Sequence, residues 1–231
     1  MQALTWKQAL VILPGLTANR DKLLYMERFF AENTTYAVYI PRIPKRRGLK
    51  MGTKWLATYF RREVQAERYD AIDVLAYISG GYILRNMAVS QPLQRLQHVI
   101  YVRSPIQERT LTQIRARYGY LSLLLMSGKL ALDVVALDPG SLDYPVTTAG
   151  QGLIIETGIS NLALSIGIDR SQIPATEWDP ATLLPDADDV IHVPESHDDM
   201  YTSPYVLKQA LHFFDHDRFQ QPSVNSIGGD P

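Results

Sequence analysis

The chain has 231 residues, 46% of them hydrophobic and 20% charged, and its formal net charge at pH 7 is −1. This composition is that of a globular protein with one well-filled core, and the near-neutral charge argues against nucleic acid as a partner. The absence of cysteine excludes disulfides, cysteine-ligated zinc and thiol catalysis.

Short β-rich runs alternate with helical patterns, which predicts an α/β fold with a mostly parallel sheet and helices on both faces. The expected strands are residues 9–14, 35–41, 69–77, 98–105, 150–158 and 189–196. The expected helices are residues 17–33, 53–68, 80–88 and 203–216, the last entered through a Ser-Pro cap. The basic stretch 44–50 is expected to be a solvated loop. The alternative is that it binds an anionic head group or an acidic partner.

Residues 106–137 are helical and apolar without a neighbouring strand, which predicts an insertion covering one edge of the sheet. The apolar part, residues 118–137, contains Lys129 and Asp133 and is therefore a poor membrane span. It is expected to act as a lid, as a plug for the substrate pocket, or as a surface for a protein partner or an acyl or lipid ligand. Residues 1–219 are expected to form one domain, followed by a flexible tail at 220–231.

The N-terminus has no basic stretch followed by an apolar core and a small-residue cleavage site, so no signal peptide is predicted. Together with the absence of cysteine, this favours a cytoplasmic location, with peripheral membrane association through the apolar insertion left open. Oligomeric state is not predicted.

The segment "VLAYISGGYILRN", residues 74–86, runs from a strand through two glycines into a helix. This is the layout of a nucleophile elbow, where a serine sits on a tight strand-to-helix turn. The segment resembles the elbow of the α/β-hydrolase family, in particular the small lipase-like and esterase-like members, which often read "YDRIDLVGYSLGGYILR". Aligned without gaps, the family's nucleophilic serine falls on Ile78 and its first glycine on Ala76. A one-residue slip would instead make Ser79 the nucleophile. An elbow also implies a positive φ at residue 78 or 79, which isoleucine disfavours.

The resemblance extends over roughly residues 9–219. In "VILPGLTANR", Pro14 replaces the histidine of the family's His-Gly turn and Gly15 is kept, which implies that the Leu16 and Ser79 N–H groups form the oxyanion hole. The stretch "VPESHDDMYTSPYVLKQALHFFDHDRF" is similar to the family's last strand, histidine loop and closing helix. It places the catalytic histidine on His197.

The sequence does not match the family's motif at the position of the catalytic acid. The family's aspartate falls near Pro174, and the nearby substitutes Asp169, Glu177 and Asp179 are out of register. Asp169 is the candidate acid if a triad exists. No cofactor is predicted, and the consecutive residues at 197–199 are not expected to form a metal site, because adjacent loop residues rarely converge on one ion.

Two functions follow from the resemblance. The first is a catalytically degenerate α/β-hydrolase-fold protein that acts as a binding or scaffold protein. The alternative is a serine esterase or lipase-like hydrolase of acyl esters that uses Ser79, His197 and Asp169. A phosphate- or nucleotide-binding domain is a third, weaker hypothesis, because no glycine-rich phosphate motif follows a strand.

Overall fold

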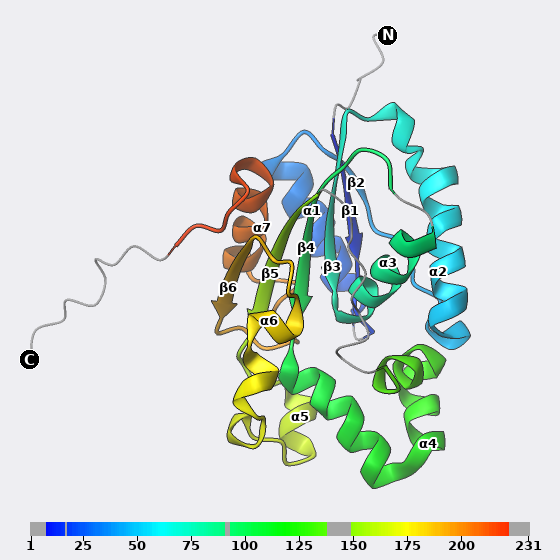
Figure 1. Cartoon of the computed structure of the whole chain (residues 1–231), viewed down its shortest axis with the longest axis vertical. Coiled ribbons are helices and arrows are strands. Elements are labelled where there is room, and N and C mark those ends of the chain that lie inside the picture. Colours follow the sequence, from blue (N-terminus) through cyan, green and yellow to red (C-terminus); the bar gives the residue numbers. More distant parts are fainter. Residues whose placement is uncertain (1–7, 17, 91–92, 138–148, 222–231) are drawn as a thin grey trace, which may run out of the picture.

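The computed structural model describes residues 8–16, 18–90, 93–137 and 149–221. A six-stranded sheet lies at its centre in the order β2-β1-β3-β4-β5-β6, and every neighbouring pair is parallel (Figure 1). The strands are β1 (Gln8–Leu13), β2 (Ala37–Tyr39), β3 (Ala71–Tyr77), β4 (Leu96–Arg103), β5 (Gly150–Glu156) and β6 (Asp189–Val193). The predicted parallel α/β fold is confirmed, and each predicted strand is found within a few residues of its expected position.

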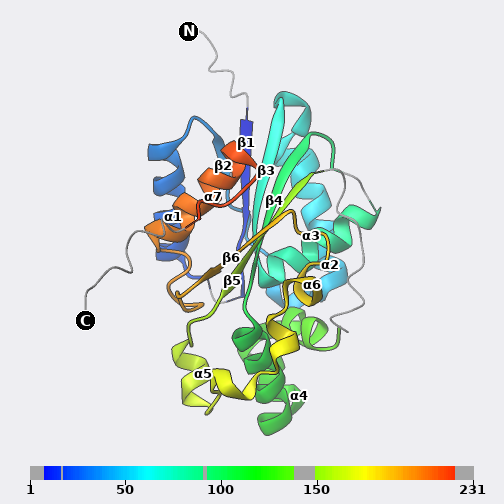
Figure 2. The same ribbon diagram turned by 60° about the vertical axis from the view of Figure 1, so that its left-hand side comes forward.

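Helices cover both faces of this sheet (Figures 1 and 2). On one face lie α1 (Arg20–Asn33) and α7 (Pro204–His216), and on the other lie α2 (Gly48–Tyr59) and α3 (Ile78–Ser90). Successive side chains of β1 point to opposite faces, so Leu10 and Ile12 pack beneath α1 and α7, while Val11 and Leu13 pack beneath α2 and α3. As predicted, Ser203 caps α7, its hydroxyl accepting a hydrogen bond from the Val206 N–H at 3.3 Å.

The basic stretch 44–50 is not the solvated loop predicted from its charge. Lys45–Arg47 form a 3₁₀ turn and α2 begins at Gly48, five residues before its expected start. Gly48 has a φ of 74°, and the next N–H, that of Leu49, donates to the Asp133 carboxylate at 2.8 Å. The helix start is therefore fixed by a contact 84 residues away in the sequence, which no local pattern reveals.

The apolar insertion forms α4 (Pro105–Val135), which is followed along the chain by the short helices α5 (Asn161–Ser165) and α6 (Pro180–Leu183). It lies beyond the carboxyl ends of the strands, against α2, α3 and α5, rather than along an edge of the sheet as predicted (Figure 1). Two glycines with positive φ, Gly119 and Gly128, bend α4. Its length and apolar composition would suffice to cross a membrane, but no straight segment between the bends reaches the ~20 residues that a span requires.

The predicted flexible tail begins at residue 220, and residues 222–231 lie outside the described part of the chain. Gln220 itself is held in place. Its N–H donates to the Gln209 side chain at 2.8 Å, and its carbonyl accepts from the same side chain at 3.0 Å. Two hydrogen bonds therefore hold Gln220 against α7.

Candidate functional site

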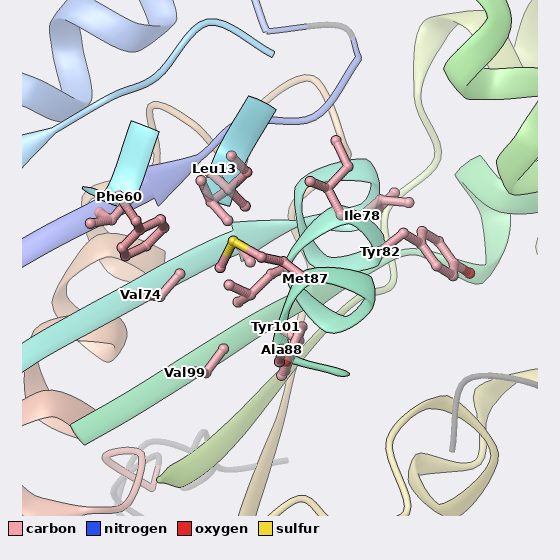
Figure 3. Packing of buried hydrophobic residues seen from close by; sticks show 14 of the residues in the cluster. Leu13, Phe60, Val74, Ile78, Tyr82, Met87, Ala88, Val99 and Tyr101 are labelled. Carbon is pink, nitrogen blue, oxygen red and sulfur yellow. The ribbon is translucent and has the colours of Figure 1, made fainter. Parts of the chain in front are cut away.

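The turn between β3 and α3 carries the segment that resembles a nucleophile elbow. β3 ends at Tyr77, and α3 begins at the next residue, Ile78. Neither Ile78 nor Ser79 has a positive φ, since the described non-glycine residues with positive φ lie elsewhere. Ile78 is 7% exposed and packs with Leu13 and Tyr82 in the core beneath α2 and α3 (Figure 3). The strained turn expected of an elbow is thus relaxed, which suits a β-branched residue.

Ser79 follows within the first turn of α3 and is only 2% exposed. No hydrogen-bond partner among the described residues reaches its Oγ, and it makes no hydrogen bond to His197. The two serine-hydrolase candidates, Ser79 and His197, are therefore not brought into hydrogen-bonding contact.

Gly80 explains how closely α3 approaches the sheet. A Cβ at this position would lie 2.5 Å from the Leu13 carbonyl oxygen and 2.7 Å from the Leu13 Cβ. The second glycine, Gly81, faces the Tyr101 ring, where a Cβ would lie at 3.0 Å. The glycines that the sequence shares with hydrolase elbows thus retain their packing role, because they let the helix start directly against β1 and β4.

His197 lies on the loop after β6, and its imidazole is buried with 3% exposure. Its Nδ1 lies 3.0 Å and 3.2 Å from the two carboxylate oxygens of Glu156, the fully buried last residue of β5. Burial lowers the pKa of His197, but the charge and hydrogen bond of Glu156 outweigh burial, so that the net pKa is raised. The site therefore holds a buried acid–imidazole pair, the arrangement that orients a histidine base.

Tyr77, Tyr201 and Gly15 form the surroundings of the His197 ring next to the end of β1. Tyr201 packs edge-on against the His197 ring and stacks on Tyr77 at a centroid distance of 4.3 Å. Its hydroxyl accepts a hydrogen bond from the Gly15 N–H at 3.1 Å. A Cβ at Gly15 would lie 3.6 Å from His197 Nε2, so this nitrogen faces the Gly15 backbone. The Tyr201 hydroxyl thus occupies the Gly15 N–H, in the turn that resembles the family's His-Gly turn.

Leu16 and Ser79 were expected to supply the oxyanion-hole N–H groups. They follow the carboxyl ends of the adjacent strands β1 and β3, which pair Leu13 with Ala76. The Leu16 carbonyl accepts a hydrogen bond from the Lys45 ammonium. Ser79 lies in the first turn of α3, where backbone N–H groups have no intrahelical partner. The role of their N–H groups as an oxyanion hole remains a prediction.

The carboxylate bonded to His197 is Glu156 and not Asp169, the residue proposed as the acid from the sequence. Asp169 is exposed and caps a 3₁₀ turn by accepting from the Ser171 N–H at 3.1 Å. Pro174 precedes another 3₁₀ turn, Glu177 pairs with Arg109 at 3.2 Å, and Asp179 caps α6. Each of these side chains has a local structural role.

Glu156 had a sequence signal that the family-loop alignment overlooked. It is the one carboxylate in the apolar run "GLIIE" and ends β5, the strand that precedes β6 and the His197 loop. In a parallel sheet the carboxyl ends of neighbouring strands lie at the same edge. A carboxylate ending β5 is therefore brought close to a histidine that follows β6.

A second buried histidine lies outside this site. His98 bonds through Nδ1 to Asp73 and through Nε2 to Asp217, both at 2.8 Å. These residues lie at the start of β3, in β4 and at the end of α7, at the opposite end of the strands from His197. Within the described ranges no group of three His, Asp or Glu residues is arranged to hold a metal ion.

The parallel sheet flanked by helices, with a histidine after the last strand bonded to the acid that ends the preceding strand, is the arrangement expected from the resemblance to α/β-hydrolases. No protein-family model matches the sequence, and no curated protein matches it. The fold is confirmed by similar solved structures. One is MGS-MChE2, an α/β hydrolase enzyme from the metagenome of lagoon sediments of Mar Chica, Morocco, with a TM-score of 0.58, 19% identity and 92% of each chain covered.

Two further structures share the fold. A lipase-esterase related protein from Clostridium acetobutylicum has a TM-score of 0.55 and 10% identity, covering 91% of this chain and 94% of its own. The N-formylmaleamic acid deformylase Nfo from Pseudomonas putida has a TM-score of 0.51 and 16% identity, covering 90% and 92%. At these identities the likeness establishes the fold and not an activity.

Proposed function

We propose that this chain is a catalytically degenerate α/β-hydrolase-fold protein, a pseudo-hydrolase that acts as a binding or scaffold protein. The observation that carries the proposal is Ile78 at the start of α3, buried in the core at the position where the family has its serine. An isoleucine side chain offers no lone pair to attack a carbonyl carbon. Ser79, the neighbouring alternative, is buried without a bond to His197.

The binding surface belonging to this proposal is the apolar insertion, residues 118–137, with a protein partner or an acyl or lipid ligand as its occupant. Support comes from large apolar side chains around the Gly119 bend that are half or more exposed. They are Tyr118 (50%), Tyr120 (59%), Leu121 (64%), Leu125 (78%) and Met126 (61%). Contiguous exposed apolar side chains of this kind are typical of interaction sites.

Replacing Leu125 and Met126 together by serine tests this surface. We expect unfolding free energy to change by no more than about 0.5 kcal/mol per residue, because both side chains are exposed. The double variant should bind a fluorescent long-chain fatty acid more weakly than the wild type does, as measured by fluorescence titration of the folded protein.

The neighbouring Leu123 supplies the matched control, since it is fully buried. Leu123→Ser should cost about 2–5 kcal/mol in urea unfolding, as other large-to-small changes in cores do. Equal fatty-acid affinity in the wild type and the double variant would rule out an acyl ligand at this surface.

A second candidate function is a serine hydrolase of acyl esters with Ser79 as nucleophile, His197 as base and Glu156 as acid. The retained Glu156–His197 pair favours it, because the acid fixes the imidazole tautomer and stabilises the imidazolium formed during attack. Ser79 Oγ would attack the ester carbonyl carbon while its proton passes to His197 Nε2. The ester C–O bond would then break and the alcohol would leave with that proton, after which water would hydrolyse the acyl-serine, release the carboxylic acid and restore the Ser79 hydroxyl. This requires Oγ to move within about 2.6–3.2 Å of Nε2.

Reaction with an active-serine fluorophosphonate probe separates the two functions. We expect no labelling of the wild type, of Ser79→Ala or of Ser165→Ala, whose serine is exposed and serves as the control for non-specific reaction. Ser79→Ala should be as stable as the wild type or slightly more so, because it removes a buried hydroxyl that has no described partner. Labelling that survives in Ser165→Ala and disappears in Ser79→Ala would overturn the pseudo-hydrolase and establish Ser79 as the nucleophile.

A further inference from the structure

His98 of β4 is buried between two carboxylates that come from different parts of the chain. Its Nδ1 lies 2.8 Å from Asp73 Oδ1 in β3, and its Nε2 lies 2.8 Å from Asp217 Oδ1 at the end of α7. The rings of Phe213 and Phe214 pack against the imidazole. A neutral imidazole has one N–H to donate, whereas an imidazolium donates from both nitrogens. Two ionised carboxylates can therefore both be bonded only by the charged form of His98.

The two carboxylates differ in their access to water. Asp73 is fully buried, and its second oxygen has no partner among the described residues. The Asp217 side chain is 77% exposed, so water can replace a lost partner. An unpaired carboxylate costs much more when it is buried than when it is exposed. When His98 loses one proton, the remaining N–H therefore stays on Nδ1 with Asp73, and the bond from Nε2 to Asp217 is lost.

Asp217 is the residue at which α7 ends. Its φ is 58°, in the left-handed region that few residues other than glycine adopt, although aspartate does so more readily than most. Its carboxylate lies beside Gly150 at the start of β5, where an added Cβ would lie 3.2 Å from it. Among the described residues, His98 is the one hydrogen-bond partner of this carboxylate. The bond therefore joins the end of the last helix to the sheet.

The other titratable groups around this cluster are acidic or phenolic. Asp215 of α7 and Tyr36, which precedes β2, interact electrostatically with Asp73. None of the described lysine or arginine side chains forms an ion pair with the three aspartates. The proton on His98 is therefore the positive charge that offsets Asp73 and Asp217.

The directions of the pKa changes agree with this geometry. Burial lowers the pKa of His98, but Asp73 and Asp217 outweigh burial, so that its pKa is raised. The contribution of the two bonds is thus complete below the unfolded value of about 6.5 and is lost as the pH rises through the folded value. Burial raises the pKa of Asp73 and outweighs its bond to His98. Protonation of Asp73 therefore limits the arrangement on the acid side.

We propose that His98 is a pH-sensitive switch that holds the end of α7 against the sheet. As an imidazolium it bonds both Asp73 and Asp217. When it gives the Nε2 proton to water, it keeps Asp73 and frees Asp217, and the turn after α7 loosens. The switch goes beyond the proposed binding function and does not depend on it, because it lies at the opposite end of the strands from His197.

Nitrogen-15 NMR of the imidazole rings in the full chain, from about pH 5.5 to about pH 10, tests the proton transfer. We expect a His98 midpoint above about 6.5 and a neutral form that carries its proton on Nδ1. Asp217→Asn should lower the midpoint by up to about one pH unit, since it removes one charge that is largely exposed. Asparagine also adopts a left-handed φ, so this variant should fold. Asp215→Asn, which removes an exposed carboxylate not bonded to His98, is the control and should change the midpoint less.

Amide hydrogen exchange tests the loosening. The protection factors of the Asp217 and Phe219 N–H groups should fall by about threefold to tenfold as the pH rises through the His98 midpoint. These groups donate to the Phe213 carbonyl and to Asp189. Protection at Ala210, in the middle of α7, should stay constant. Equal midpoints in the wild type and Asp217→Asn, a neutral ring protonated on Nε2, or unchanged protection after α7 would overturn the switch.

Discussion

Glu156→Gln is expected to lower the free energy of unfolding by about 1–3 kcal/mol at about pH 5.5, and by less than about 1 kcal/mol at about pH 9. The carboxylate raises the pKa of His197 above its ordinary value despite burial. A group whose pKa is raised in the folded state stabilises that state below its unfolded pKa, here about 6.5, and loses this contribution as the pH rises through the folded value. Above that value, neutral His197 can still donate from Nδ1 to a glutamine oxygen.

Urea unfolding of the variant and the wild type at the two pH values measures this difference. Glu32→Gln, an exposed substitution on α1, is the matched control and should stay within about 0.5 kcal/mol of the wild type at both. A Glu156→Gln effect that is the same at both pH values, or larger at the higher one, would mean that the charged pair is not what stabilises the histidine loop.

Gly80→Ala is expected to destabilise the protein by about 2–3 kcal/mol, the range of overpacked cores. The added methyl would lie 2.5 Å from a backbone oxygen of β1, which cannot rotate away, so the first turn of α3 must move. Unfolding free energy from urea titration, with circular dichroism as the signal, measures the cost.

Gly52→Ala in α2 is the paired comparison. Its methyl would meet only the end of the flexible Ile83 side chain, at 3.1 Å. Replacing a helical glycine by alanine gains up to about 1 kcal/mol of helix propensity, so this variant should be neutral or stabilised. If the two variants were equally stable, the close approach of α3 to β1 would not be what requires Gly80.

The architecture could be predicted because buried parallel strands are continuous apolar runs, which can be identified from the local sequence alone. Runs such as "ALVIL" and "VIYVR" could be placed in order, and the Ser-Pro cap of α7 fixed its start to within a residue. The start of α2 was missed because it depends on Asp133, a residue of the distant helix α4. Local patterns cannot report a tertiary contact of that kind.

The site was only partly predictable, for a similar reason. The resemblance of the stretch after the last strand singled out His197, which is buried in the structure. The acid was sought in a loop, where the family carries it, although strand order brings the last residue of β5 to His197. The relaxed turn at Ile78 could be predicted from the sequence, because a β-branched isoleucine disfavours a positive φ.

The position of α7 has a consequence for how the chain reaches its folded state. Val206 and Phe213 of this last helix cover Leu10, Ile12 and Ile100, which belong to strands made in the first half of synthesis. Until α7 leaves the ribosome, that face of the sheet is covered only in part, by α1. Parallel pairing between distant strands is also slow. A nascent chain, or one truncated before residue 204, should therefore expose an apolar sheet face and depend on chaperones until the final helix docks.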